Sequence, residues 1–213
     1  MATAAPTTEK GRRTRERIVR AAAELVSRNG AVAMSLDEVG ELAPASRSQL
    51  YHYFENKDDL IRAVVDATSD AVLGAQDELL AAVNSWAGLE RWMDSLVAIQ
   101  TERGARGGCP LGSLAGQIAE RDPQARLAIA AGLDRWQGEI EAALLRLQAT
   151  GRIDAGADCA DLARSTLGLI QGGLLLTQVR RDPGQLRAAL DDALDLLRLH
   201  RNSRAQGARP LRR

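Results

Sequence analysis

Two helix starts that lie close together constrain the fold of this chain more than any other feature. Ser35 begins the stretch "SLDE" and Ser46 begins "SRSQ". Both match the capping box, in which a serine and the acidic or amide residue three positions later cap one helix start. Pro44 disfavours helical backbone at Ala43, so the first helix ends there. Two helices joined by so few residues must cross steeply, which predicts a helix-turn-helix.

Apolar residues recur with helical spacing on both sides of these two short helices. Upstream, the pattern predicts an amphipathic helix over residues 12–29, which Gly30 ends. Downstream, it predicts helices over residues 58–80, 86–103, 110–120, 123–149, 158–181 and 183–200. We find no strand-like alternation. The predicted fold class is therefore all-α, with an N-terminal three-helix helix-turn-helix head on a larger C-terminal helical bundle.

Charge and composition exclude several classes of protein. No stretch approaches the roughly 18 uninterrupted apolar residues of a membrane span, and the first residues lack the apolar core of a signal peptide. Cys109 and Cys159 suit a reducing cytoplasm, and His52 and His200 cannot build a metal site between them. We therefore expect a cytoplasmic protein with no metal, cofactor or membrane partner. The formal net charge is zero, although residues 10–20 and the end of the chain are basic.

The short helix after Ser46 has two different faces. Over residues 47–54, an inward apolar stripe is predicted for Leu50, Tyr53 and Phe54. The residues left to face outward are Arg47, Ser48, Gln49, Tyr51 and His52. Glutamine can pair with adenine and arginine with guanine, so this face suits DNA. The alternative is a solvated face with a tyrosine packed at its edge.

Residues 14–65, from "TRERIVRAAAELVSRNG" to "YHYFENKDDLIRAVV", resemble the N-terminal signature of the TetR-family transcriptional repressors. The resemblance assigns DNA contacts to Ser35, Arg47, Ser48, Gln49, Tyr51, His52 and Lys57. It also implies a homodimer that reads a palindromic double-stranded DNA operator and releases it when a small-molecule inducer binds the C-terminal bundle. We expect a disordered leader over residues 1–11 and a helix-turn-helix DNA-binding domain over residues 12–57. A ligand-binding and dimerisation domain should follow over residues 58–200, with a basic tail over residues 201–213.

Three positions depart from the usual family pattern. Pro44 stands where glycine is common in the turn, Ala45 where valine is typical, and Gly40 where a small helix former such as alanine is usual. Since the proline ring disfavours positive φ, we expect the turn to be formed differently here.

The C-terminal bundle contains candidate ligand-binding residues, which are Trp92, Leu96, Ile99, Cys109, Leu114, Trp136 and Gln171. A ligand cavity is an apolar space with a few polar groups, and two tryptophans could line one. The alternative is that each tryptophan belongs to the core. Cys109 precedes Pro110 in "GGCPLGSL", at an expected helix start where a thiol can be nucleophilic. This segment resembles a TetR subgroup with "GCP-L", some of whose members sense thiol-reactive compounds, but a buried and inert cap residue is the alternative.

The last two predicted helices are the candidate dimer interface. Small residues occur in "LGLIQGGLLL", and leucines repeat along the final helix. The residues assigned to the interface are Leu169, Gly172, Gly173, Leu176, Leu186, Leu190 and Leu194. Packing within one chain against the predicted helix over residues 123–149 is the alternative for these stripes.

The function predicted is that of a ligand-responsive repressor which binds DNA as a homodimer and is not an enzyme. Two alternatives come from other classes. One is a helical interaction module that kept the head but lost sequence-specific DNA binding. The other is an enzyme with Cys109 as the nucleophile, for which the sequence offers no suitable base.

Overall fold

The structure, a computed structural model, describes residue 6 and residues 8–202. These residues form ten helices joined by short connections, together with one isolated β-bridge between Ile153 and Arg201. The predicted all-α fold is confirmed. Residues 1–5 and 7 of the expected leader and residues 203–213 of the expected tail lie outside the described part of the chain.

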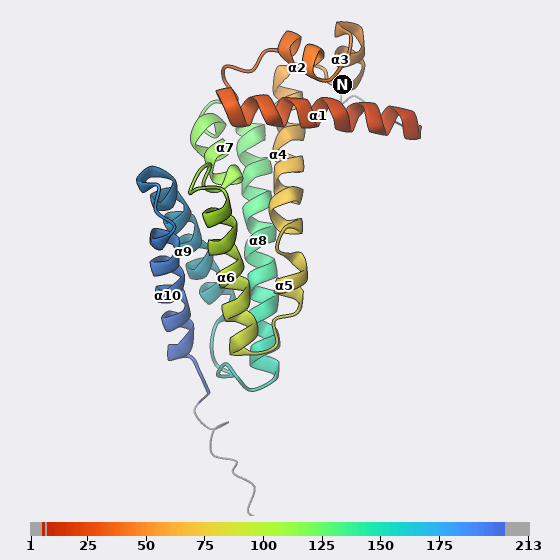
Figure 1. Cartoon of the computed structure of the whole chain (residues 1–213). Coiled ribbons are helices and arrows are strands. Elements are labelled where there is room, and N and C mark those ends of the chain that lie inside the picture. The colour runs from red at the N-terminus through yellow and green to blue at the C-terminus, as the bar shows by residue number, and fades with distance from the viewer. Residues whose placement is uncertain (1–5, 7, 203–213) are drawn as a thin grey trace, which may run out of the picture. The chain divides into compact units, whose positions relative to one another are not determined.

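The described residues divide into two compact units, of which one lies within residues 6–72 and 110–133 and the other within residues 73–109 and 134–202. The first unit holds α1 (Glu9–Asn29), α2 (Leu36–Leu42), α3 (Arg47–Tyr53), most of α4 (Lys57–Gly74), α7 (Pro110–Ile118) and the start of α8 (Pro123–Ala149). The second holds α5 (Asp77–Ala81), α6 (Trp86–Glu102), the rest of α8, α9 (Cys159–Arg180) and α10 (Gly184–Leu199). In the first unit, α2 and α3 lie together along one side of α1 (Figure 1).

Local capping chemistry determines most of the helix starts. α1 begins at Glu9, before the expected start at residue 12, because the hydroxyl oxygen of Thr8 accepts the N–H of Gly11 at 3.1 Å. Both predicted capping boxes are present, with Ser35 capping α2 and Ser46 capping α3. Asn56 Oδ1 accepts the N–H of Asp59 at 2.9 Å and so caps α4.

The turn between α2 and α3 differs from the expectation for its proline. Pro44 has a φ of 22°, outside the usual proline range. The N–H of Ala45 donates to the carbonyl of Gly40 at 2.9 Å, which is the six-to-one bond of a Schellman motif. The expectation that Pro44 would avoid positive φ is therefore wrong. The turn has the left-handed backbone for which glycine is the usual residue.

Gly40 lies where the backbone of this turn approaches α2 most closely. A Cβ at Gly40 would stand 2.9 Å from the carbonyl oxygen of Ala45, closer than real Cβ contacts come. Because the obstructing atom belongs to the backbone, no side-chain rotation relieves the contact. The close approach of the turn to α2 accounts for the glycine at this position.

The helix expected over residues 58–80 is interrupted in the structure. α4 ends at Gly74 and α5 begins at Asp77. Between them Gln76 is buried, and its side-chain oxygen accepts the indole N–H groups of Trp92 and Trp136, each at 3.0 Å. These bonds hold the Gln76 side chain in the interior of the second unit. The periodicity of the sequence does not distinguish Gln76 from the other polar residues around it.

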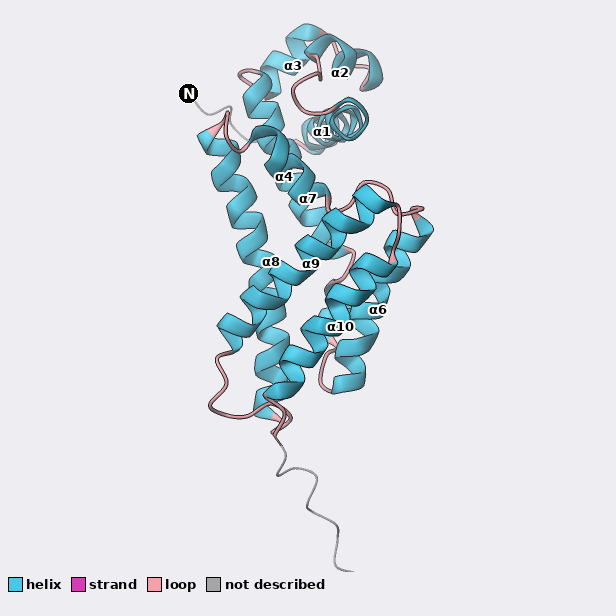
Figure 2. Ribbon diagram, turned by 90° about the vertical axis from the view of Figure 1, so that its left-hand side faces the viewer, coloured by secondary structure: helices cyan, strands magenta, loops and turns pink. Residues whose placement is uncertain are grey.

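In the second unit, α9 and α10 lie side by side (Figure 2). Gly173 permits this packing, because a Cβ there would lie 2.9 Å from the Cβ of Ala189 and 3.1 Å from the Cα of Leu186. The hydroxyl of Thr177 accepts the N–H of Leu186 at 3.0 Å, which ties the start of α10 to α9.

Candidate nucleic-acid interface and sensor site

α3 places its apolar and polar side chains on different faces, as predicted. Leu50 and Phe54 are each only 3% exposed, and Tyr53 is half-buried. The five residues assigned to the outer face are all exposed, namely Arg47, Ser48, Gln49, Tyr51 and His52. The buried pair fixes the rotation of α3 about its axis, so the outer face is presented as one surface.

Hydrogen bonds within α3 already occupy part of this polar face. The backbone N–H of Ser46 donates to Gln49 Oε1 at 2.9 Å, and the N–H of Gln49 donates to Ser46 Oγ at 3.3 Å. The hydroxyls of Ser46 and Ser48 lie 3.1 Å apart. The predicted pairing of Gln49 with adenine therefore competes with a bond inside the helix. Among the described residues of the head, Arg47, Tyr51 and His52 make no side-chain hydrogen bond that would oppose a DNA contact.

Two other residues assigned to DNA also have partners within the head. Ser35 caps α2 and donates its hydroxyl to Glu38 Oε2 at 2.7 Å. The Lys57 ammonium donates to the carbonyl of Val32 at 2.8 Å, which ties α4 to the loop before α2. These hydrogen bonds to Ser35, chiefly from its side chain, lower the pKa of Glu38 below the usual value of a glutamate.

The basic run in α1 has structural contacts that its sequence did not reveal. Arg17 Nε donates to the carbonyl of Ala43 at 2.8 Å, at the end of α2. The Arg15 guanidinium lies 5.2 Å from the centre of the Phe54 ring, a cation–π distance. Arg12 and Arg13 both bond Glu9. The run is therefore not simply a free cationic face, because Arg17 and Arg15 brace α2 and α3 against α1.

The two tryptophans assigned to the ligand site are both core residues of the second unit. Trp92 and Trp136 are 0% and 2% exposed, and their indole N–H groups both bond Gln76. One amide oxygen with two donors is fully used, so these indoles keep no free N–H for a ligand. Gln76 was not among the predicted site residues, since nothing in its sequence context distinguishes it.

Two side-chain amide atoms in the second unit are buried without a partner among the described residues, one in the candidate Gln171 and one in Gln100, which bonds the residue before the candidate Cys109. Cys109 is 7% exposed and directly precedes Pro110, the first residue of α7 as predicted. Gln100, which is 3% exposed, donates its Nε2 to the carbonyl of Gly108 at 3.4 Å and leaves its buried Oε1 without a partner. Gln171 Nε2 is also buried without a partner. Unpaired buried amides are rare in folded proteins and identify positions that a polar ligand could satisfy.

The remaining ligand candidates are distributed between the two units. Leu96 is buried and Ile99 is half-buried, both in the second unit, whereas Leu114 is buried in the first unit. Burial raises the pKa of the Cys159 thiol, with the carboxylates of Glu141 and Asp158 adding to the effect. This favours the neutral and less reactive thiol at Cys159.

The residues assigned to a dimer interface divide into a buried and an accessible set. Gly173 and Leu186 are buried where α9 meets α10, Leu190 is also buried, and Leu194 is only 8% exposed. All four are buried within the protomer, and the packing of Gly173 and Leu186 joins α9 to α10, whereas the alternative prediction placed their partner at residues 123–149. The accessible apolar residues follow α9 instead, as Gly168, Gly172, Leu175, Leu176 and Val179, with Leu169 half-buried beside them.

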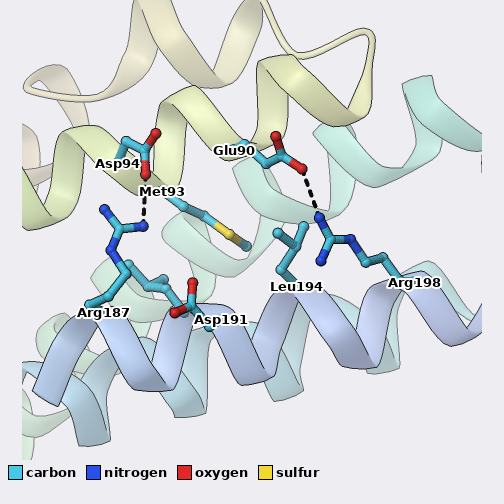
Figure 3. Close-up of a pocket in the computed structure, with 8 residues that line it drawn as sticks. Glu90, Met93, Asp94, Arg187, Asp191, Leu194 and Arg198 are labelled. Carbon is cyan, nitrogen blue, oxygen red and sulfur yellow. Dashed lines mark hydrogen bonds and ion pairs between the residues drawn. The ribbon is translucent and has the colours of Figure 1, made fainter. Parts of the chain in front are cut away.

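A groove of about 260 Å³ lies between α6 and α10 (Figure 3). Its floor contains Met93 and Leu194, and ion pairs cross it at two places. Arg187 lies 2.7 Å from Asp94, and Arg198 lies 2.9 Å from Glu90. These side chains are all largely exposed, so the pairs contribute little to stability and chiefly fix how α10 lies against α6.

Two negative findings apply to the part of the chain that the structure describes. No group of three or more histidine, cysteine, aspartate or glutamate side chains there could hold a metal ion. No helix there is long and apolar enough to cross a membrane.

Comparison with known protein families gives two matches. Residues 18–64 match "Bacterial regulatory proteins, tetR family", and residues 85–193 match "Tetracyclin repressor-like, C-terminal domain". A protein named as an uncharacterized HTH-type transcriptional regulator from Mycobacterium tuberculosis is 30% identical over 179 residues, covering 79% of this chain and 86% of the relative. The transcriptional regulator AcuR of Cereibacter sphaeroides is 26% identical over 173 residues, and the match covers 80% of this chain and 79% of the relative.

Solved structures with the same fold cover most of the chain. The regulatory protein TetR from Rhodobacter sphaeroides has a TM-score of 0.74 at 22% identity, covering 85% of this chain and 97% of that one. A TetR-family regulator from Cytophaga hutchinsonii has a TM-score of 0.78 at 19% identity, and the match covers 92% of this chain and 98% of that one. At these identities the likeness shows the fold alone. The subgroup with the "GCP-L" segment stays a prediction.

Proposed function

The chain belongs to the TetR family of transcriptional regulators, and from this premise we propose that it is a repressor which binds a palindromic operator as a homodimer. We further propose that a small-molecule inducer binds the C-terminal bundle and releases the DNA. Members of this family are regulators rather than enzymes, which removes the hypothesis of an enzyme using Cys109.

The observation that carries the proposal is the outer face of α3. It exposes a guanidinium, an amide, a phenol and an imidazole on one short helix, of which Leu50 and Phe54 anchor the other face. These groups together can contact both base edges and phosphates in a major groove. We assign base reading to Arg47, Gln49 and His52, with phosphate contacts from Tyr51.

The accessible stripe on α9 supports the homodimer. Leu175, Leu176 and Val179 are 60%, 44% and 71% exposed, which is unusual for large apolar side chains on one helix. Gly168 and Gly172 lie on the same face, and a Cβ at either would meet no atom within 4 Å. A second α9 could therefore approach closely over the glycines and cover the apolar side chains. This assignment retains Leu169, Gly172 and Leu176 from the predicted interface.

The inducer site is proposed within the second unit, near the two unpaired amides. Gln100 offers a buried acceptor and Gln171 a buried donor, and neither has a partner among the described residues. A ligand that satisfies both would recover two hydrogen bonds that the free protein lacks. Leu96, Ile99 and Cys109 remain candidates for its apolar surroundings.

The proposed function is tested by selecting random DNA duplexes on the purified protein at near-physiological salt. We expect a palindrome whose half-site centres lie about one helical turn, or a multiple of it, apart. Weak, salt-sensitive and sequence-blind binding would instead support the interaction-module alternative.

The dimer is tested separately with a charged substitution on the α9 stripe. Val179→Glu should convert the dimer into a monomer and abolish binding to the full palindrome, because it places a charge at an apolar contact. Leu127→Glu is the control, since Leu127 is 50% exposed on α8 and lies outside the stripe. Sedimentation would measure the mass of each variant, and an unchanged mass for Val179→Glu would rule out this interface.

A further inference from the structure

The capping box of α3 determines which atoms of Gln49 face outward. The backbone N–H of Ser46 donates a hydrogen bond to the side chain of Gln49 at 2.9 Å. Only the amide oxygen of Gln49 can accept this bond, because its nitrogen is a donor. The oxygen therefore points back toward Ser46, the N-cap residue that precedes the helix. Gln49 is exposed, and no partner for its NH₂ group occurs among the described residues.

This orientation has a consequence for base recognition. Glutamine reads adenine through two bonds, in which its NH₂ donates to N7 and its oxygen accepts from the N6 amine. Both amide atoms must then face the base edge, but the oxygen of Gln49 is already bonded to Ser46. With only the NH₂ directed outward, adenine would offer N7 as its single acceptor, and its N6 amine would stand beside it as a second donor. Guanine instead presents two neighbouring acceptors, O6 and N7.

We propose that Gln49 reads DNA as a hydrogen-bond donor only, and that the operator has guanine rather than adenine at the base that Gln49 faces. The inference rests on the proposed function, because it requires α3 to lie in the major groove. Gln49 is then a specificity-determining residue whose preference is set by its own helix cap.

The capping box of α2 shows how this preference could be reversed. There the equivalent residue is Glu38, and its Oε2 accepts the N–H of Ser35 at 3.1 Å. A glutamate thus forms the same box in the same head. Gln49→Glu should therefore keep the cap of α3 while replacing the outward donor with an acceptor, and an acidic side chain accepts from the N4 amine of cytosine.

The experiment selects operators from random duplexes with the full-length protein and its variants at one salt concentration. The wild type should recover guanine at the base in question, and Gln49→Glu should recover cytosine, with a preference of about tenfold in each case. Gln49→Ala should leave that base undetermined and the rest of each half-site unchanged. Glu38→Gln, the reverse exchange in the α2 box, is the matched control and should leave the whole consensus unchanged.

Two results would overturn the inference alone, and a third would remove the proposed function on which it rests. Adenine at this base for the wild type, lost in Gln49→Ala, would show that the amide leaves its box and reads with both atoms. An identical consensus for the wild type and Gln49→Glu would show that Gln49 contacts no base. The absence of any consensus, including for the wild type, would instead remove the proposed function itself. Circular dichroism of each variant confirms that the helices are intact, so that a lost preference is not unfolding.

Discussion

The capping boxes of α2 and α3 use the same local chemistry but differ in the groups that they leave for other contacts. In α2, Glu38 accepts both the N–H and the hydroxyl of Ser35, at 3.1 and 2.7 Å. In α3, Gln49 accepts only the N–H of Ser46, and the Ser46 hydroxyl lies against Ser48 instead. In the first box a single carboxylate oxygen accepts both bonds from the serine, whereas in the second the amide oxygen accepts one bond and the NH₂ group of the exposed Gln49 remains available.

This difference shows how one motif can serve two purposes in adjacent helices. The α2 box closes a helix start in which the serine and the carboxylate satisfy each other. The α3 box closes a helix start and also orients a side chain on the proposed DNA face. The turn between them sets how the two helices approach, so the comparison depends on Gly40 and Pro44 as well as on the caps.

Gly40→Ala tests the close approach of the two helices and should have the largest effect. The new Cβ would overlap the carbonyl oxygen of Ala45, which is a backbone atom and cannot rotate away. We therefore expect an overpacking cost of about 2–3 kcal/mol, in the upper part of the usual range, against the roughly 1 kcal/mol that alanine gains in helix propensity. We expect a net loss of about 1–2 kcal/mol in a urea titration. Gly138→Ala is the control, because Gly138 lies inside α8 with no atom near the new Cβ, and it should be neutral or stabilising.

Ser35→Ala and Ser46→Ala compare the two boxes directly. Loss of a serine cap costs about 0.5–2 kcal/mol, and Ser35 makes one more side-chain bond to its box partner than Ser46 does. Ser35→Ala should therefore cost about 1–2 kcal/mol and Ser46→Ala about 1 kcal/mol in thermal unfolding. Equal losses would show that the bond between the Ser35 hydroxyl and Glu38 adds no stability.

Pro44→Gly tests the backbone of the turn. Glycine adopts positive φ without strain, whereas a residue held in an unfavourable region costs of order 1–3 kcal/mol. The gain is reduced because glycine increases the entropy of the unfolded chain by about 0.4–1 kcal/mol. We expect the free energy of unfolding to rise by about 1 kcal/mol, with Pro44→Ala as the control that keeps a Cβ. A less stable Pro44→Gly variant would mean that proline holds the turn at its usual φ in solution.

Glu38→Gln should have the smallest effect, and one that depends on pH. The pKa of Glu38 is lowered in the folded protein, so its contribution is present above the unfolded pKa and is lost as the pH falls through the folded value. Urea titrations across that range should show a wild-type advantage over Glu38→Gln that is greatest near neutrality and shrinks toward acid. If the difference in the free energy of unfolding between the wild type and Glu38→Gln did not vary with pH, ionisation of the Glu38 carboxylate would not be the source of the added stability.

The sequence predicted those parts of the fold that depend on neighbouring residues. The caps at Ser35 and Ser46, and the start of α7 at Pro110, are decided within one helical turn. The inward stripe of α3 follows in the same way from the spacing of Leu50 and Phe54. The family resemblance over the head also came from local motifs, and the matched region at residues 18–64 confirms it.

Several parts of the candidate sites could not be predicted because their causes lie far away in the chain. The break before α5 depends on Gln76 bonding two tryptophans from other helices. Gly173 and Leu186 have the spacing of an interface, but α9 and α10 use them to pack against each other. The free apolar surface along α9 was visible only once that packing was known.

The sequence by itself determined that the chain is helical, where most helices begin, and that a helix-turn-helix stands near its start, because these properties depend on short-range periodicity and capping. Tertiary structure decided which polar groups remain available. Arg17, Lys57 and Gln76 appear in the sequence as free polar residues, yet each bonds a group that is distant along the chain. A hydrogen bond requires its partner within about 3 Å, and only the folded chain specifies which partners are that close.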